Sequence, residues 1–350
     1  MPHQEPHDRQ PLRMGERGKS GNGVEGGGWF HDYRSTGSPA PQQDRLWTSF
    51  APVAGKPRCD SVREKQEVSM SSPASRTATR QIGDAEVTIL TDGRTEFGPE
   101  LFPGTPEERI SAVLSAQQVE AIATNFNAVL IRNGGKTILC DAGPRDLFGP
   151  TCGFLPQAME EAGVSADQVG VLFATHLHPD HVAGMITQSG EAVFPAAELV
   201  VTREEHAFWS DAAKTDAAPA PLPDWGRLAR AVLAAYGDRL RLIEAGGEIA
   251  PGLTSMPLAG HTPGHGGWRL SSGAGHLIHG GDIIHAPALQ AADPDIGIAF
   301  DMDMDTARAT RKRLLDELAT EGALFTGGHF LHPAFHVAVR DGAGYRLERP

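Results

Sequence analysis

The chain has 350 residues, 40% of them hydrophobic, which is enough to fill the core of one large domain or two ordinary ones. Its formal net charge is −13, and no stretch approaches the ~20 consecutive apolar residues of a membrane-spanning helix, which excludes an integral membrane protein. Residues 1–80 hold 12 of the 31 basic and 9 of the 44 acidic side chains. Residues 81–350 therefore have 19 basic and 35 acidic side chains, a net charge of −16. A domain this acidic repels polyanions, so nucleic acid is not an expected partner.

The first 80 residues have the composition of a disordered leader. They contain the glycine run 26–28 and the Pro-Ala-Pro run 39–41, and they show no sustained hydrophobic period of 2 or 3.6. Such a segment does not bury enough apolar area to offset the chain entropy lost on folding. We therefore predict a disordered leader over residues 1–80 and one catalytic domain over residues 81–350. The alternative is that translation starts at Met70 and the upstream sequence is not part of the protein.

The first predicted elements are short strands. Residues 86–90 form a β-rich run that Asp92 and Gly93 close. A hairpin follows, with strands at 128–131 and 137–140 and the turn pair Asn133-Gly134 between them.

Helices and strands are interspersed along the rest of the body. Residues 155–162 have the pattern of a helix that Gly163 ends, and the apolar run 169–174 is too short for a helix and suits a buried strand. Further helices are predicted at 228–236 and 306–319, and further strands at 240–243, 276–278 and 323–325. Because no repeat of 20–50 residues is present, we predict a layered α+β or α/β fold.

Four potential metal ligands directly follow the predicted strand 169–174, in the sequence Thr-His-Leu-His-Pro-Asp-His. In an extended segment His176 and His178 project to the same side, and a turn at Pro179 brings Asp180 and His181 to a second position nearby. Imidazoles and a carboxylate are typical ligands of transition metals. This spacing predicts a site for two ions.

Three more candidates lie beside glycines in predicted loops or at strand ends. His261 lies in Gly-His-Thr-Pro-Gly-His, Asp282 in Gly-Gly-Asp, and His329 in Gly-Gly-His. Together with the first cluster they make seven ligands, a plausible set for two metals.

The order H-x-H-x-D-H, H-T-P-G-H, G-D and G-H resembles the metallo-β-lactamase-fold hydrolases over about residues 84–345. The runs GDIIHAPALQ at 281–290 and FDMD at 300–303 are similar to the branch that holds methyl parathion hydrolase and the acyl-homoserine-lactone lactonases. This resemblance implies a four-layer αββα metallo-β-lactamase sandwich with the site along one edge of its two sheets.

The resemblance also implies three ligands for each ion and one ligand that both ions share. The first ion takes His176, His178 and His261, the second takes Asp180, His181 and His329, and Asp282 bridges both together with a hydroxide. Zinc is the default metal because it suits nitrogen and oxygen ligands, with manganese, cobalt and iron as alternatives.

Asp180 and His285 are the catalytic candidates. Asp180 has a second oxygen that is free to pass a proton to the leaving group, although a ligand role alone explains it equally well. His285 follows Asp282 by three residues, at the position where the related lactonases carry a substrate-contacting tyrosine. Both a hydrogen bond to the substrate and a purely supporting role remain open for it.

Most of the other distinctive residues have a simpler reading. We expect His265 to brace its loop. Structural roles are expected for His206, His276, His279, His332 and His336, and core packing is favoured over pocket lining for Phe208, Trp209, Phe300 and Phe330. The acidic run 301–305 is expected to cap the helix that follows it. Substrate choice is assigned to the loops 97–106 and 212–225.

The predicted function is hydrolysis of a small neutral ester, lactone or phosphotriester at a dinuclear metal centre. The alternatives are a thioesterase of the glyoxalase II type and a mononuclear iron persulfide dioxygenase; a non-enzymatic binding protein is disfavoured because all seven ligand residues are present. Three cysteines, Cys59, Cys140 and Cys152, make a poor disulfide framework, so we expect a cytoplasmic protein. The expected partner is a small-molecule substrate, and a homodimer is the default oligomer.

Overall fold

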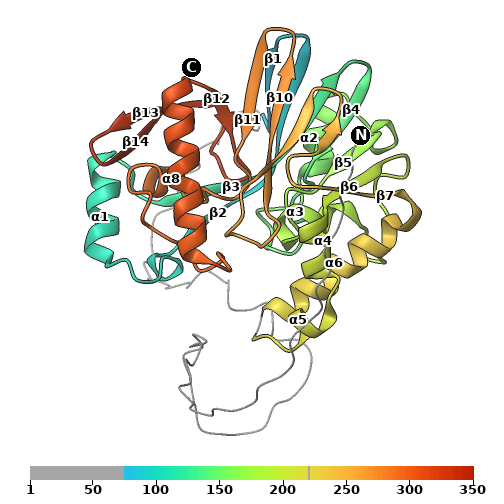
Figure 1. Ribbon diagram of the computed structural model, residues 1–350, viewed down its shortest axis with the longest axis horizontal. Helices are drawn as coiled ribbons and strands as arrows, with labels where there is room; N and C mark the ends of the chain where they lie inside the picture. The colour runs from blue at the N-terminus through green and yellow to red at the C-terminus, as the bar shows by residue number, and fades with distance from the viewer. Residues whose placement is uncertain (1–74, 220) are drawn as a thin grey trace, which may run out of the picture. The chain divides into compact units, whose positions relative to one another are not determined.

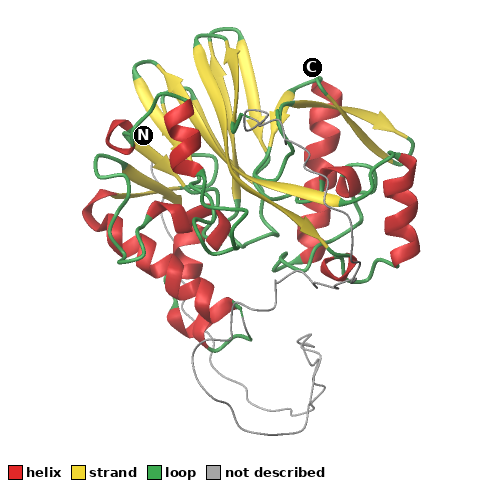
Figure 2. Ribbon diagram, turned by 180° about the vertical axis from the view of Figure 1, so that it is seen from behind, coloured by secondary structure: helices red, strands yellow, loops and turns green. Residues whose placement is uncertain are grey.

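The structure is a computed structural model that describes residues 75–219 and 221–350 (Figure 1). The first 74 residues, and Met70 and Cys59 with them, lie outside this part of the chain, so the leader stays a prediction. The described residues form two seven-stranded sheets, with helices on their outer faces (Figure 2). None of the helices within these residues is long and apolar enough to cross a membrane.

The first sheet carries its strands in chain order: β1 (Thr77–Ile82), β2 (Ala85–Phe97), β3 (Ile122–Asn133), β4 (Lys136–Cys140), β5 (Val171–Phe173), β6 (Glu198–Thr202) and β7 (Leu240–Ile243). Strands β1 to β4 pair antiparallel, and β4 to β7 pair parallel. The β3–β4 turn is Gly134-Gly135, one residue later than predicted, and both glycines have the positive φ, 56° and 76°, that this tight turn requires.

Parallel neighbours need longer crossovers than antiparallel ones, and here helices supply them. The crossovers contain α2 (Leu155–Glu161), α3 (Pro179–Val182), α4 (Arg203–Trp209), α5 (Ala212–Asp216) and α6 (Leu222–Tyr236).

The second sheet has the order β14-β13-β12-β11-β10-β9-β8. Its strands are β8 (Glu248–Ala250), β9 (Leu253–Pro257), β10 (Gly266–Ser272), β11 (Gly275–His279), β12 (Leu324–Thr326), β13 (His336–Asp341) and β14 (Gly344–Glu348). Only β11 and β12 pair parallel, and the crossover between them contains α7 (Pro287–Gln290) and the long α8 (Met304–Glu321). The remaining helix, α1 (Glu107–Ala116), lies between β2 and β3 in the chain.

Alternating side chains of the first sheet divide the interior into two layers. Val129 and Ile131 of β3 belong to the apolar cluster between the sheets, whereas Ala128 and Leu130 belong to the cluster under α2 and α6. Helix α8 covers the second sheet with Leu314, Leu315 and Leu318. The predicted four-layer αββα sandwich is therefore confirmed.

Strand β1 corrects the predicted domain boundary, because residues 77–80 were assigned to the leader. Thr77 pairs with Leu90 and Ile82 with Ala85 across an antiparallel ladder with β2. Only Ile82 of this edge strand is buried, so its sequence lacks the apolar alternation that marks the other strands. Several other elements that the sequence did not predict are short or polar in the same way, among them β8, β9, α1 and α5.

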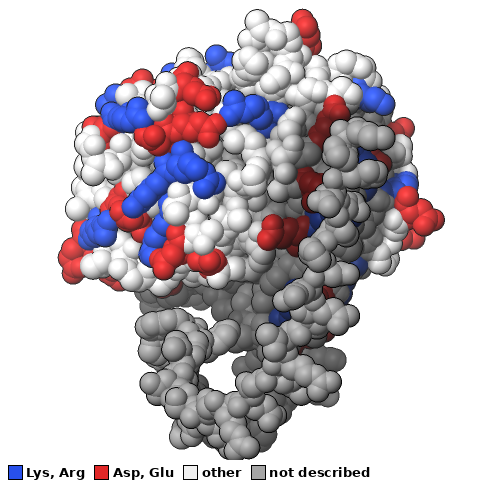
Figure 3. Space-filling view, viewed as in Figure 1, with Lys and Arg blue, Asp and Glu red and all other residues white. Residues whose placement is uncertain are grey.

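Basic and acidic side chains alternate on the face shown in Figure 3. Along α8, for example, Arg308 lies 3.0 Å from Asp305 and Lys312 lies 2.5 Å from Asp295. Cys140 and Cys152 are buried free thiols, as expected.

Asp92 of β2 holds the start of α2. Its Oδ2 accepts a hydrogen bond from the Gly153 N–H (2.9 Å) and its Oδ1 accepts one from the Leu155 N–H (2.7 Å). Burial nevertheless raises the pKa of this carboxyl to about 6.

A pH-dependent loss of stability is expected from Asp92. Because its pKa is higher in the folded than in the unfolded chain, the folded state binds the proton more tightly, and stability falls as the pH rises from about 4 to above 6, by about 3 kcal/mol for a shift of this size. Urea unfolding of the wild type and Asp92→Asn at both ends of this range isolates the group. A difference in unfolding free energy between the two proteins that does not change with pH would contradict the assignment.

Candidate metal centre

The seven predicted ligand side chains lie together, although they come from four separate segments. His176 and His178 follow β5, and Asp180 and His181 lie in α3, which Pro179 begins. The remaining three come from the second sheet: His261 from the β9–β10 loop, Asp282 from the residues after β11, and His329 from the residues after β12. The site thus lies where both sheets end.

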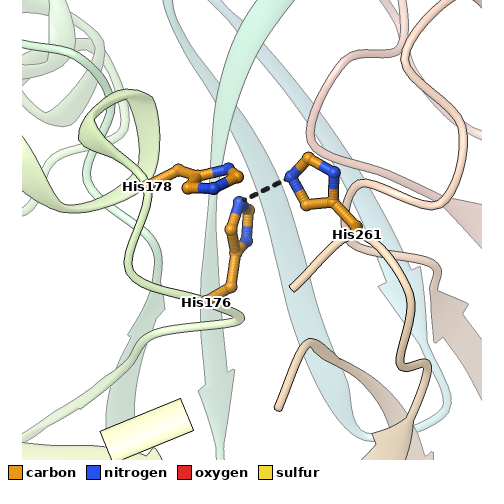
Figure 4. Close-up of side chains that lie close together, drawn as sticks. All are labelled: His176, His178 and His261. Carbon is orange, nitrogen blue, oxygen red and sulfur yellow. Dashed lines mark hydrogen bonds between the residues drawn. The ribbon is translucent and has the colours of Figure 1, made fainter. Parts of the chain in front are cut away.

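The first cluster consists of His176, His178 and His261 (Figure 4). One ligand atom from each lies within 4.8 Å of the others, and the Nε2 atoms of His176 and His261 are 3.1 Å apart. All three side chains are buried, and the Nε2 of His178 has no hydrogen-bond partner in the described part of the chain. Three buried nitrogens that converge in this way fit a shared cation.

The second cluster consists of Asp180, His181, Asp282 and His329. The Asp282 Oδ2 atom lies 2.7 Å from the His329 Nε2 and 3.0 Å from the His181 Nε2. Asp180 places its own Oδ2 3.4 Å from the His181 Nε2 and 3.5 Å from the His329 Nε2.

Asp282 also reaches the first cluster. Its Oδ2 is 3.8 Å from the His176 Nε2 and 3.7 Å from the His261 Nε2, and its buried Oδ1 has no partner among the described residues. One carboxylate therefore stands between the two clusters.

Three of these imidazoles are oriented by a partner on the other ring nitrogen. The His181 Nδ1 is 2.9 Å from Asp141, the His261 Nδ1 is 3.0 Å from Asp301, and the His329 Nδ1 donates to the Asn125 carbonyl (2.9 Å). Such partners fix the tautomer that leaves Nε2 free for a metal.

Sequence reasoning missed Asp141 and Asp301. Asp141 directly follows β4, and that position at a strand end was the only available signal. The acidic run 301–305 was predicted to cap a helix, and Asp303 does cap α8 by accepting from the Thr306 N–H (3.0 Å). Asp301 is buried instead, and it also contacts the buried Arg311 guanidinium at 3.5 Å.

His265 braces the site as expected. Its Nδ1 donates to the Leu258 carbonyl (2.6 Å), and its Nε2 accepts from the Asp282 N–H (2.9 Å). The position of the Asp282 backbone thus depends on His265 and not on the Asp282 side chain.

His285 reaches the centre itself. Its Nε2 lies 3.2 Å from the Asp282 Oδ2, and its ring stacks on His329 with 4.8 Å between ring centroids. His285, His261 and Asp282 form a third group with metal-ligand spacing. The Nδ1 of His285 is buried and has no hydrogen-bond partner within the described residues.

Two partly buried aromatic rings lie next to histidines of the centre. Phe300 lies 6.0 Å from His285, and Trp225 lies 4.7 Å from His178, between ring centroids. Trp209 and Phe330 are buried in the core, as favoured from the sequence. The segment 212–225 is not the loop that was predicted, because Asp211 caps α5 by accepting from the Ala213 N–H (3.0 Å) and α6 begins at Leu222.

The histidines of the two clusters differ in protonation. Burial, together with neighbouring imidazoles, lowers the pKa of His176, His178 and His261 well below the usual range, so all three are neutral. Burial acts in the same direction on His181 and His329, but the surrounding carboxylates, Asp282 and Asp180 above all, together outweigh it and raise the pKa of both. Protons therefore occupy the second cluster when no metal is bound.

Metal binding is consequently expected to release protons. A divalent ion must displace the protons of His181 and His329, so affinity should rise with pH and about one to two protons should be released per chain at pH 7. Titration of zinc into metal-free protein in dilute buffer with a pH indicator measures this. A pH-independent affinity would contradict the charge state.

Known proteins were compared with this chain. The sequence profile described as Metallo-beta-lactamase superfamily matches residues 124–329, more than half of the chain. No curated protein matches it.

Solved structures with the same fold include two with more than a quarter of their residues identical. AidC, a dizinc quorum-quenching lactonase in complex with a product, is 27% identical with a TM-score of 0.73, over 79% of this chain and 98% of that one. The hydrolase AbOPH is 28% identical with a TM-score of 0.74, over 78% and 97%. A probable metal-dependent hydrolase from Staphylococcus aureus shares the fold at 22% identity and a TM-score of 0.63, over 77% and 99%.

The matched segment contains all seven ligand residues and also Asp141 and Asp301, the acidic partners of His181 and His261. The chain therefore belongs to the metallo-β-lactamase superfamily of hydrolases, and its similarity lies with the lactonase-like branch.

Proposed function

We propose that this protein is a dinuclear metallohydrolase that cleaves a small neutral ester, lactone or phosphotriester. The observation that carries the proposal is the position of the Asp282 Oδ2, which lies within 4 Å of the Nε2 atoms of His176, His261, His181 and His329. A carboxylate that touches both imidazole groups is placed to bridge two ions.

The donor set fits two divalent cations. The His178 Nε2 and the Asp282 Oδ1 are buried without a hydrogen-bond partner among the described residues, and both are atom types that commonly bind metal ions. The first ion would be held by His176, His178 and His261, the second by Asp180, His181 and His329, with Asp282 on both. We propose zinc, because nitrogen and oxygen ligands suit it and the similar lactonase AidC is a dizinc protein.

Ions bound at such a site supply an acidified water and stabilise the negative charge that develops on the attacked group. The chain provides the proton transfers and the orientation. Burial disfavours a charge on Asp180, but His181 and His329 more than compensate and hold its pKa well below the usual range, so it is ionised, as a metal ligand must be. We assign the transfer of a proton to the leaving group to its second oxygen. His285 faces this centre with its Nε2, 3.2 Å from the Asp282 Oδ2, and we assign to it a hydrogen bond to the substrate oxygen on which charge develops.

The substrate class follows from the walls of the site. Trp225 and Phe300 present apolar rings next to His178 and His285, which favours an uncharged substrate with an apolar body. The similar structure of a lactonase with its bound product adds weight to the lactone within this class.

A hydrolysis panel tests the proposal. Zinc- and manganese-loaded protein is assayed with aryl esters, lactones and phosphotriesters, beside a glutathione thioester and a glutathione persulfide, and metals are counted per chain. We expect about two ions per chain and turnover in the first three classes. One iron per chain with persulfide oxidation, or turnover of the thioester alone, would contradict the proposal.

A further inference from the structure

Glu205 of α4 is a buried carboxylate that is not one of the seven metal ligands. Its side chain is inaccessible to solvent, with 0% exposure, and no Lys, Arg or His of the described residues pairs with it. Four donors surround it instead. Its Oε1 accepts from the Leu177 N–H (2.9 Å) and the Trp209 Nε1–H (2.6 Å), and its Oε2 accepts from the Thr262 hydroxyl (2.7 Å) and the Gly264 N–H (3.1 Å).

Three of these four donors come from the two segments that carry the first metal cluster, and the fourth, Trp209, lies in α4 itself. Leu177 lies between His176 and His178, and Thr262 directly follows His261. The two oxygens of one carboxylate therefore join the β5–α3 segment to the β9–β10 loop. Asp180 and His181 of the second cluster share the Leu177 segment, but no ligand of that cluster comes from the β9–β10 loop, so the separation of the two segments concerns the first cluster.

The close approach of the β9–β10 loop to α4 supports this reading. A Cβ atom at Gly264 would lie 2.1 Å from the Glu205 backbone nitrogen, so no larger residue fits there. Thr202, the residue before α4, donates from its hydroxyl to the Gly264 carbonyl at 3.0 Å. The glycine of the H-T-P-G-H motif is thus explained by contact with α4.

The hydrogen bonds to the buried Glu205 carboxylate hold the two segments at a fixed separation. A carboxylate accepts about four hydrogen bonds, and all four positions of Glu205 are used. A buried charge is tolerated only when it is fully hydrogen-bonded, so displacement of either segment costs the buried carboxylate at least one of its four donors. The distance between the two segments is therefore strongly restrained.

We propose that Glu205 is a positioning residue that sets the separation of the two ligand segments of the first metal cluster and thereby determines the affinity for that ion alone. This inference rests on the proposed function, because it assumes that the His176, His178 and His261 cluster binds a metal.

The experiment measures zinc affinity in two single-site backgrounds, by competition with a chromophoric chelator. His329→Ala disables the second cluster and leaves the first, whereas His178→Ala disables the first and leaves the second. Adding Glu205→Gln is expected to weaken zinc binding about 10- to 100-fold in the His329→Ala background, the usual effect of losing such a partner. In the His178→Ala background the expected change is less than about threefold by the same reasoning.

Asp92→Asn is the matched control, because Asp92 is also a buried carboxylate that accepts backbone hydrogen bonds but touches no ligand segment. It is expected to change the melting temperature without changing either zinc affinity. If Glu205→Gln does not fold, Thr262→Val removes one of the four donors and should weaken only the first site, by at least about threefold.

An equal loss of affinity in both backgrounds, or no loss in the first, would overturn the inference. These results are distinct from failure of the proposed function, which would appear as wild-type protein that binds no zinc or only one ion.

Discussion

Asp282→Ala is expected to remove at least one metal ion per chain and nearly all hydrolytic turnover while the sandwich stays folded. The Asp282 Oδ2 is the carboxylate oxygen nearest to the Nε2 atoms of both His181 and His329, and its loss leaves Asp180, at 3.4 and 3.5 Å, as the one carboxylate that still faces both of these nitrogens. Turnover should fall by more than the ~10²- to 10³-fold that removal of a single stabilising group costs.

The fold should survive because the Asp282 side chain does not hold its own loop. The Asp282 N–H donates to His265, and the Gly281 carbonyl accepts from the Gly328 N–H, so the backbone is fixed without the carboxylate. Circular dichroism of the purified variant tests whether the fold is retained, and metal analysis tests whether an ion is lost.

Asp303→Ala is the control for this variant, since Asp303 is an aspartate of the same segment of chain that caps α8 and touches no ligand. It should lose about 1 kcal/mol of stability, as cap removal does, and keep both metals. Two ions per chain in Asp282→Ala would show that the carboxylate does not bridge.

The sequence predicted the candidate site better than it predicted the elements around it. His176, His178, Asp180 and His181 are neighbours in the chain, so their proximity follows from local geometry. His261, Asp282 and His329 are far from them in sequence, and only their glycine neighbours and the family resemblance brought them into the set.

The partners of the ligands were beyond sequence reasoning for a physical reason. Asp141, Glu205 and Asp301 act through contacts that only the packed sandwich creates, such as the 2.7 Å bond from Thr262 to Glu205. Nothing in a single sequence separates a buried acid of this kind from a surface one. The same limit applies to β1, whose polar edge strand is defined by pairing with β2 and not by its own pattern.

His285→Ala is expected to lower the catalytic rate about 10²- to 10³-fold with metal content unchanged, because it removes a donor to the substrate oxygen. The ring faces the metal centre through its Nε2, and the backbone N–H of His285 is held separately by the Gln290 side chain at 2.7 Å. The loop should therefore keep its place when the imidazole is lost.

The competing role for His285 is to hold the metal ligand Asp282 in place, since the His285 Nε2 lies only 3.2 Å from the Asp282 Oδ2. In that case His285→Ala would weaken metal binding about 10- to 100-fold, and the rate of the fully loaded variant would recover. Measuring kcat at saturating zinc beside zinc affinity separates the two roles.

His285→Tyr is the sharper probe, because a phenol restores a donor of similar reach and matches the residue of the related lactonases. We expect it to recover most of the rate lost in His285→Ala, and to do so for lactones in particular. His336→Ala removes a partly buried imidazole that is not among the ligand groups and should leave both readouts unchanged. Full metal occupancy and unaltered turnover in both His285 variants would show that His285 has no catalytic role, and the substrate would then have to approach the metals from the Trp225 side.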